Sequence, residues 1–358
     1  MDRFKVPEEI AVRVAPDDMR RTVEAIFQSL GTPPEDARRS ADALIYADVR
    51  GIDSHGVSNM MPIYVEMLKQ GFTNPAPSLR VLSETDAVAT VDSDRGFGLT
   101  IGPQCMDLAL DKAERCGIGS VVATNGRHFG AAAYHASLAL ERDMIGIALT
   151  VGGLEVAPTF GGEARVGLNP IGIAVPARDE PPFVFDASMS SIAGNKIRLA
   201  RRLGSTVLPG WIATPEGTPI MQECPVPEEF LMLPLGATRE LGSHKGYGLA
   251  VMVDILSGLL GGDPAGFERA PGDVSHHFLA YRVGAFTELE AFKDRMDAYL
   301  RGLRDTKPAP GEARVLYAGL PEHEAELERR ERGIPYHPKV IEWFRKTSDE
   351  LGTEYRLP

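Results

Sequence analysis

Short runs of β-branched and small apolar residues alternate with helical stretches between about residues 85 and 202, and this alternation constrains the fold more than any other feature. The strand-like runs are AVATV at 87–91, GSVVAT at 119–124, IGIALT at 145–150 and FVFD at 183–186. The helical stretches between them lie at about 101–115, 131–142 and 188–202. Such alternation predicts an α/β region with helices packed on a sheet.

Helical patterns dominate on both sides of this region. Apolar stripes ending at Gly31, Gly51 and Gly71 predict three helices in the first part of the chain, and the second begins with a capping box at Thr32–Glu35. A buried helix is expected at 245–260, and charged helices are expected at 286–304, 321–332 and 336–351. The Pro- and Gly-rich stretch at about 203–243 reads as an ordered loop.

Composition excludes several classes of protein. The 358 residues carry a net charge of −12, which disfavours nucleic acid and anionic membranes as partners. No apolar run approaches the roughly 18 residues of a membrane span, and no secretory signal opens the sequence. The three cysteines lack metal-ligand or disulfide spacing, so we expect a cytoplasmic protein with no structural metal site.

The segment RGIDSHGV at 50–57 places an acid, a hydroxyl and an imidazole in a tight connection between two helices. His55 there is suited to general acid catalysis, oriented by a neighbouring hydroxyl or carboxylate. The alternative is structural: Asp53 or Ser54 caps the next helix, and His55 is a surface residue.

Two further segments follow expected strands. NGRHFG at 125–130 is a strand-to-helix turn in which free amides could contact a ligand, or a glycine-rich turn with a chance histidine. Asp186 ends the run FVFD, and the carboxyl end of a strand faces the usual ligand crevice of an α/β sheet. Its alternative role is to cap a helix beginning near Ser188.

The segment GSHKGYG at 242–248 places Lys245 at a helix start among three glycines, which favours a phosphate or carboxylate contact over a merely flexible turn. It does not match the P-loop pattern. The Gly-x-Gly at 117–119 lacks the third glycine of a dinucleotide fingerprint and precedes a strand, so no Rossmann domain is expected.

Taken in order, these segments resemble one family, the type-2 malate/L-lactate dehydrogenases, which includes sulfolactate and ureidoglycolate dehydrogenases, 2,3-diketo-L-gulonate reductase and the piperideine/pyrroline-2-carboxylate reductases. The matching segments are ADVRGIDSHGV, NGRHFGAAAYHA, GLNPIGIAVP, FDASMSSIAGNKI, GSHKGYGLAVMVDILSG and RGIP at 332–335. The resemblance implies a non-Rossmann, mixed-sheet α/β fold of the L-sulfolactate dehydrogenase-like type with helical ends. It also implies NAD or NADP as cofactor and a homodimer with sites near the subunit boundary.

We accordingly expect three parts. A helical N-terminal region covers residues 1–75, and an α/β core covers 76–285, with its cofactor-binding part at about 120–230. A helical C-terminal region at 286–358 is expected to pack with the N-terminal part.

The resemblance also implies roles for individual residues. His55 would protonate the new hydroxyl or amine, with Ser54 and Asp186 as its relay, while His128 is the second choice for the acid or base. The residues implied to contact the cofactor are His128, Gly153, Asp186, Ala187, Ser188, Lys245 and Gly246. The expected activity is hydride transfer between NAD(P)H and a small 2-oxo acid, 2-hydroxy acid or cyclic imino acid.

One departure from the family pattern concerns the substrate. Many relatives carry an arginine that holds the substrate carboxylate where this chain has Asn59, and an amide cannot provide that charged, bidentate contact. Arg127 is the first candidate replacement and Arg50 the second. Otherwise the substrate lacks an α-carboxylate, or the chain is an inactive binding protein on the same fold.

Overall fold

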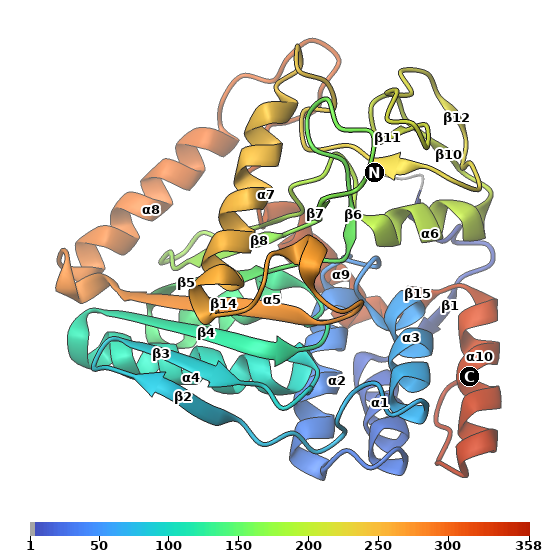
Figure 1. The fold of residues 1–358 in the computed structure, drawn as a ribbon, viewed down its shortest axis with the longest axis horizontal. Coiled ribbons are helices and arrows are strands. Elements are labelled where there is room, and N and C mark those ends of the chain that lie inside the picture. The colour runs from blue at the N-terminus through green and yellow to red at the C-terminus, as the bar shows by residue number, and fades with distance from the viewer. Residues whose placement is uncertain (1–3) are drawn as a thin grey trace.

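The computed structural model describes residues 4–358, and its centre is a seven-stranded mixed sheet (Figure 1). The strands, in spatial order, are β2 (Arg80–Glu84), β3 (Val88–Asp92), β4 (Ile118–Gly126), β14 (Val274–Arg282), β5 (Met144–Thr150), β8 (Ile171–Val175) and β9 (Phe183–Ala187). Only β3 and β4 pair in parallel, and every other neighbouring pair in this sheet is antiparallel. This arrangement is not a doubly wound parallel sheet, which confirms the expected non-Rossmann α/β fold.

Helices cover both faces of the sheet. On one face lie α4 (Gly98–Cys116), α5 (Ala132–Ser137) and the 3₁₀ helix η2 (Leu138–Arg142), and on the other lies α7 (Ser243–Ser257), followed by η3 (Leu259–Gly261) and η4 (Gly266–Glu268) (Figure 1). Alternate strand residues such as Val121 and Phe278 pack against α4 and α5 in a continuous core. The sheet is therefore covered on both sides.

The two ends of the chain form a helical layer beyond one end of the strands (Figure 1). Here α1 (Pro16–Ser29), α2 (Pro34–Val49) and α3 (Val57–Lys69) share a core with α10 (Pro338–Leu351), and α9 (Leu320–Arg332) contacts α2. The strands β1 (Val12–Val14) and β15 (Ile334–Tyr336) pair antiparallel and join the layer. By contrast, η5 (Val283–Ala285) and α8 (Leu289–Arg304) follow β14 away from this layer. The division into three domains remains a prediction.

The stretch expected as a loop at 203–243 contributes short strands to a smaller unit, which also includes elements from residues 154–203. This unit contains the four-stranded sheet β11 (Ile212–Ala213), β13 (Leu231–Met232), β6 (Leu154–Val156), β7 (Val166–Gly167), the pair β10 (Thr206–Val207) and β12 (Cys224–Pro225), and the helix α6 (Gly194–Leu203). The helix begins at residue 194 and not at the expected 188. The intervening segment instead pairs with 233–235, since Ser191 N donates to Leu233 O at 2.8 Å.

The sequence did not suggest β14, although it is an inner strand of the large sheet. Its sequence VSHHFLAYR places His276 and His277 where apolar residues would mark a buried strand. His276 is fully buried and satisfied by Thr150 Oγ1 at 2.8 Å and Arg127 O at 3.1 Å. Polar residues that form hydrogen bonds inside the fold therefore occupy buried positions of this strand, and the sequence lacks the apolar pattern that predicts an inner strand. No helix in residues 4–358 is both long and apolar enough to cross a bilayer.

Candidate active site

A buried carboxylate anchors the turn between α2 and α3. Asp48, 1% exposed, accepts hydrogen bonds from Val57 N at 3.2 Å and from the Tyr336 hydroxyl at 2.7 Å. Burial raises the pKa of Asp48 to about 7. By bonding the first amide of α3, Asp48 acts as the cap that α3 otherwise lacks, and it fixes where the turn ends.

Arg329 of α9 holds the other side of the same turn. Its guanidinium donates to Asp48 O at 2.5 Å and to Asp53 Oδ1 at 2.6 Å. Asp53 therefore neither caps α3 nor contacts His55 in the part of the chain that the structure describes. It ties the turn to α9, and two charged contacts leave the segment at 50–56 little freedom to move.

The turn presents His55 to His128. Ser54 Oγ lies 2.9 Å from His55 Nδ1, and the two imidazole rings stack with centroids 5.8 Å apart and planes 8° apart. Burial, with the nearby charge of Lys196, lowers the pKa of His55 to about 4. His55 is therefore neutral near neutral pH and exchanges hydrogen-bonding roles with a hydroxyl that can both donate and accept.

His128 is held differently. Its Nδ1 accepts from the Tyr64 hydroxyl at 2.6 Å and from Gly130 N at 3.3 Å. An amide can only donate, so Nδ1 is unprotonated and Nε2 carries the ring proton. Burial lowers the pKa of His128 to about 3, which keeps it in this neutral, Nε2-donating form. His128 can thus offer a hydrogen bond but has no free nitrogen to accept a proton.

Asp186 lies near the end of β9 and bonds the start of α5. Its Oδ2 accepts from Ala133 N at 2.7 Å, and burial raises its pKa to about 6. Among residues 4–358, no hydrogen bond joins this carboxylate to Ser54. Of the implied relay, the hydrogen bond between Ser54 and His55 is present, whereas Asp186 is not hydrogen-bonded to Ser54 within the described residues.

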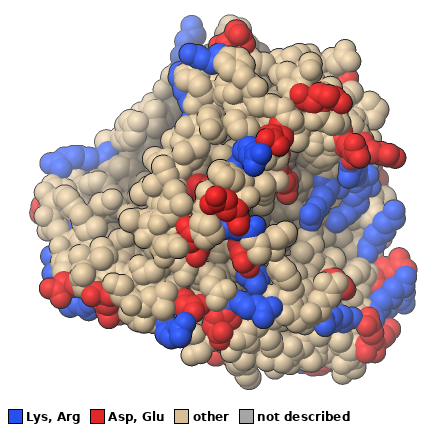
Figure 2. Space-filling model, in the orientation of Figure 1, with Lys and Arg blue, Asp and Glu red and all other residues tan. Residues whose placement is uncertain are grey.

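Lys196, in the first turn of α6, is a charged residue that the sequence did not suggest and whose charge acts on this group. Its positive charge lowers the pKa values of both His55 and Asp186, and burial lowers its own. The side chain is half-buried, and within the described chain the ammonium forms no ion pair with a carboxylate. Figure 2 shows Lys and Arg side chains gathered over α6 beside a hollow in this face.

Neither arginine proposed for the substrate carboxylate is free. Arg127, 4% exposed, donates to Asp273 Oδ1 at 2.6 Å and to Phe72 O at 3.0 Å, and its guanidinium lies over the Phe72 ring. Arg50 is buried and pairs with Glu326 Oε2 at 2.7 Å. Both arginines therefore link parts of the fold, and neither guanidinium is free to bind a substrate carboxylate.

Asn59 is likewise occupied by protein partners. It is 4% exposed; its Nδ2 donates to Asn195 O at 3.1 Å and weakly to Ser54 O at 3.5 Å, and its Oδ1 accepts from Arg202 at 2.9 Å. Asn59 therefore joins the turn that carries His55 to α6.

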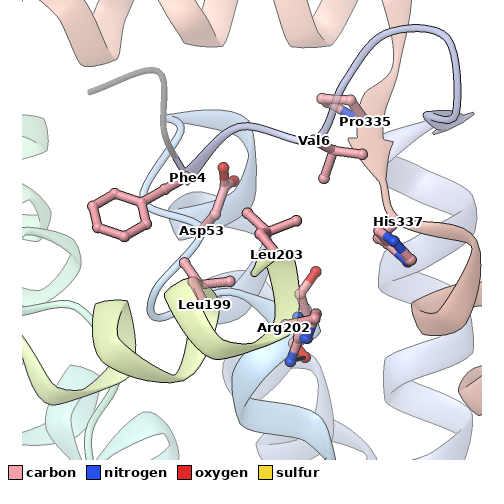
Figure 3. A pocket seen from close by; sticks show the side chains of 9 residues that line it. Phe4, Val6, Asp53, Leu199, Arg202, Leu203, Pro335 and His337 are labelled. Atoms are coloured by element: carbon pink, nitrogen blue, oxygen red, sulfur yellow. Dashed lines mark hydrogen bonds between the residues drawn. The ribbon is translucent and has the colours of Figure 1, made fainter. Parts of the chain in front are cut away.

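Arg202 itself lines a small pocket together with Phe4, Asp53 and His337 (Figure 3). Neither His55 nor His128 lines that pocket. The guanidinium that meets Asn59 thus lines a pocket to which the paired histidines do not contribute.

Two of the segments implied to bind cofactor, those that carry Ser188 and Gly246, are joined although they are far apart in the sequence. Met189 N, next to Ser188, donates to Leu168 O at 2.7 Å, and Met189 O accepts from Leu235 N at 2.9 Å. Gly246 packs so closely on Leu235 that a Cβ there would lie 2.4 Å from its carbonyl oxygen. The segment after β9 and the start of α7 are therefore joined through residue 235.

The glycines before β6 join the same group. Gly152 N donates to Asn169 Oδ1 at 2.9 Å, and Asn169 in turn donates to Ala250 O of α7 at 2.7 Å. Gly153 is exposed, as is Lys245 in the first turn of α7, which makes no ion pair in the described residues. An exposed cation at a glycine-rich helix start is chemically suited to the phosphates of a dinucleotide.

Tyr64 and Lys196 are the residues of this site that sequence reasoning missed. Tyr64 belongs to an apolar helical stripe, so its pattern indicates a core residue, and it is indeed fully buried. Lys196 lies inside the quoted segment FDASMSSIAGNKI, but nothing local marks its closeness to His55. Only the tertiary arrangement of α3 and α6 brings the two together.

Comparison with known proteins places this site in a family. Residues 14–345 match the family described as malate/L-lactate dehydrogenase. The chain is 36% identical to a malate dehydrogenase of Pyrococcus abyssi, over 97% of each chain, and 31% identical to an L-sulfolactate dehydrogenase of Methanocaldococcus jannaschii, over 94% and 96%. The solved malate dehydrogenase of Pyrococcus horikoshii superposes with a TM-score of 0.89 at 34% identity, covering 98% of both chains. The chain therefore belongs to the malate/L-lactate dehydrogenase family.

Proposed function

We propose that this protein is a nicotinamide-dependent dehydrogenase that interconverts a small 2-hydroxy acid and its 2-oxo acid, with the malate–oxaloacetate pair as the first candidate. The observation that carries the proposal is the contact group of the part-exposed His55 and His128 with the buried Ser54 and Tyr64, which provides one proton-exchanging and one hydrogen-bond-donating imidazole side by side. The names of the relatives cited above support the substrate class.

His55 is assigned the proton transfer. In the oxidation of a hydroxy acid it takes the hydroxyl proton, and in the reverse direction it returns that proton to the new hydroxyl. Its lowered pKa makes it the neutral base at neutral pH. Ser54 can accept from the imidazolium or donate to the imidazole, so it stabilises both protonation states.

His128 is assigned to polarise the carbonyl. Because Tyr64 and Gly130 occupy its Nδ1, its Nε2–H is available to donate to a carbonyl oxygen and to stabilise charge that develops there. Asp186 contributes by holding the start of α5 and by balancing the charge of Lys196.

NAD or NADP fits the segments around Leu235 and would supply the hydride acceptor or donor. Lys245, with exposed backbone at Gly153 and the glycine-rich start of α7, would hold the phosphates. We assign Ala187, Ser188 and Gly246 to the same cofactor site, because they adjoin the same joined segments.

A homodimer in the cytoplasm belongs to this proposal. Along α7 and η3 the side chains of Leu249, Met252, Ile255, Leu259 and Leu260 are exposed, and the middle of α7 is mainly uncharged in Figure 2. An apolar stripe of this kind is typical of an interface between subunits. Light scattering of the purified protein should give twice the monomer mass, and a monomer would contradict this assignment.

The direct test is a substrate panel. Oxidation of NADH and of NADPH, followed by absorbance, is measured with oxaloacetate, pyruvate, a cyclic imino acid and a neutral ketone. Turnover of the 2-oxo acids above the others supports the proposal. A neutral ketone reduced as efficiently would indicate a substrate without an α-carboxylate, and nucleotide binding without turnover would indicate an inactive binding protein.

A further inference from the structure

We propose that Lys196 is the residue that binds the substrate carboxylate, an inference that rests on the function proposed above. A desolvated carboxylate next to a proton-transferring imidazole needs a fixed positive charge. The structure shows which cations near His55 and His128 can provide one and which are already paired.

Most of the candidate cations are already bound to protein partners. Arg127 and Arg50 are bound to Asp273 and Glu326. Arg202 donates to Asn59 Oδ1 and Ser58 O and lines a pocket that includes neither histidine. Each of these three guanidiniums is therefore directed to a protein partner away from the paired imidazoles.

The position of Lys196 follows from the contacts of its neighbour. Asn195 O accepts from Asn59 Nδ2 at 3.1 Å, and Asn195 Nδ2 contacts Met60 Sδ at 3.3 Å. These contacts fasten the first turn of α6 against the first turn of α3, immediately after His55. Lys196, the next residue along α6, is thus fixed beside the proton-transferring turn.

The charge of Lys196 is not neutralised by a contact ion pair. Asp186 and Glu322 are the acidic groups that act on it, yet neither forms a salt bridge with it in residues 4–358. The oxygen Oδ2 of Asp186 is occupied by Ala133 N, and Glu322 Oε2 accepts from Gly319 N at 3.2 Å. A half-buried ammonium that forms no salt bridge within the described residues can bind the carboxylate of a ligand.

Arg198, on the same helix, is the remaining cation, since its charge acts on His128 and Glu155. It is exposed, whereas Lys196 is half-buried and its charge acts on His55 itself. A carboxylate held by Lys196 would place the adjacent carbonyl or hydroxyl carbon next to the imidazole that exchanges its proton. Lys196 therefore defines the substrate as a carboxylic acid.

The test compares wild type with Lys196→Met, Lys196→Arg and the control Arg201→Met. Arg201 is on the same helix but donates to Pro227 O at 2.6 Å, so its replacement removes a charge from α6 without touching the histidine group. The measurements are KM and kcat for oxaloacetate and pyruvate, the Kd for NADH from fluorescence quenching, and the binding of oxamate to the NADH complex.

Lys196→Met should raise the KM for both acids and weaken oxamate binding by about 10- to 100-fold, the scale of one charged hydrogen bond. The Kd for NADH should stay at its wild-type value, Lys196→Arg should recover part of the loss, and Arg201→Met should behave as wild type. An unchanged KM, a loss confined to kcat, or a parallel loss of NADH binding would overturn the assignment of Lys196 while leaving the proposed function standing. If wild type reduces no 2-oxo acid at all, the proposed function fails first and the inference fails with it.

Discussion

Replacement of Gly56 by alanine tests whether the turn that carries His55 is as tightly constrained as its contacts indicate. The backbone of Gly56 has φ −85°, which any residue can adopt, so the requirement for glycine is one of space. A Cβ built at Gly56 would lie 1.7 Å from Asp48 Oδ1, whereas real Cβ atoms essentially never approach within 3.0 Å. The two atoms must therefore separate by at least 1.3 Å (3.0 minus 1.7).

The Asp48 side chain cannot move aside without losing hydrogen bonds. Its other oxygen is bonded to Val57 N and to the Tyr336 hydroxyl, and the carboxyl group is buried. Overpacking costs about 1–3 kcal/mol, and breaking a buried hydrogen bond costs about 1–3 kcal/mol more. We expect Gly56→Ala to lower the free energy of unfolding by about 3 kcal/mol. Because His55 adjoins the displaced residue, turnover should fall by about 100-fold.

Urea unfolding and steady-state turnover measure the two effects. The matched control is Gly302→Ala in α8, where no atom lies within 4 Å of the added Cβ. That variant should gain about 0.5–1 kcal/mol from helix propensity and keep wild-type turnover. Wild-type stability and turnover in Gly56→Ala would refute the reasoning, because they would mean that the turn relaxes freely.

Three further outcomes follow from the same contacts. Tyr64→Phe removes the 2.6 Å bond to His128 and should lower kcat by about 10- to 100-fold with little change in NADH binding; an unchanged kcat would remove Tyr64 from the site. Arg127→Met should destabilise the fold by about 3 kcal/mol, since it removes the hydrogen bonds of a buried guanidinium to Phe72 O, Gly126 O and the part-exposed Asp273. The KM of correctly folded enzyme should stay at its wild-type value, and a KM increase alone would restore Arg127 as a substrate ligand. Burial lowers the pKa values of His135 and His276 to about 4 and about 3, so on acidification the unfolded chain, with histidine pKa values near 6.5, takes up protons first. Stability should be full above about pH 6.5 and fall as the pH drops towards 4, because the histidines with lowered pKa values outnumber Asp48 and Asp186, whose raised pKa values act in the opposite direction; the histidines are His55, His128, His135, His276 and His277. Equal urea midpoints at pH 7 and about pH 5 would contradict this.

Much of the fold and of the site could be predicted because the relevant signals are local. The strand-like runs ending at Asp186 and preceding Asn125 lie where the structure has β9 and β4, and the glycine stops mark the ends of α1, α2 and α3. The segments that carry His55, His128 and Lys245 stand out from their immediate neighbours. Their order along the chain was enough to indicate the family.

The remaining features depend on tertiary contacts that no local pattern reveals. Arg127 was the first candidate for the substrate carboxylate because its partner Asp273, 146 residues away, is not evident in the sequence. The contact of Asn59 with Arg202 was equally hidden, because Arg202 is on another helix. Lys196 became a candidate only when α6 was seen against α3. In each case the partner of the charged or amide group, or the site that the group faces, lies on an element distant in the sequence.

The most direct test of the account is the comparison of His55→Ala with His128→Ala. The account predicts that His55→Ala lowers kcat for a 2-oxo acid by about 100-fold or more, keeps the wild-type Kd for NADH, and regains activity when imidazole is added, since a free base can replace the missing proton carrier. His128→Ala should also lose activity, but added imidazole should not restore it, because His128 only donates a hydrogen bond from Nε2. Wild-type turnover in a folded His55→Ala enzyme, or rescue by imidazole of His128→Ala alone, would contradict the assignment of proton transfer to His55.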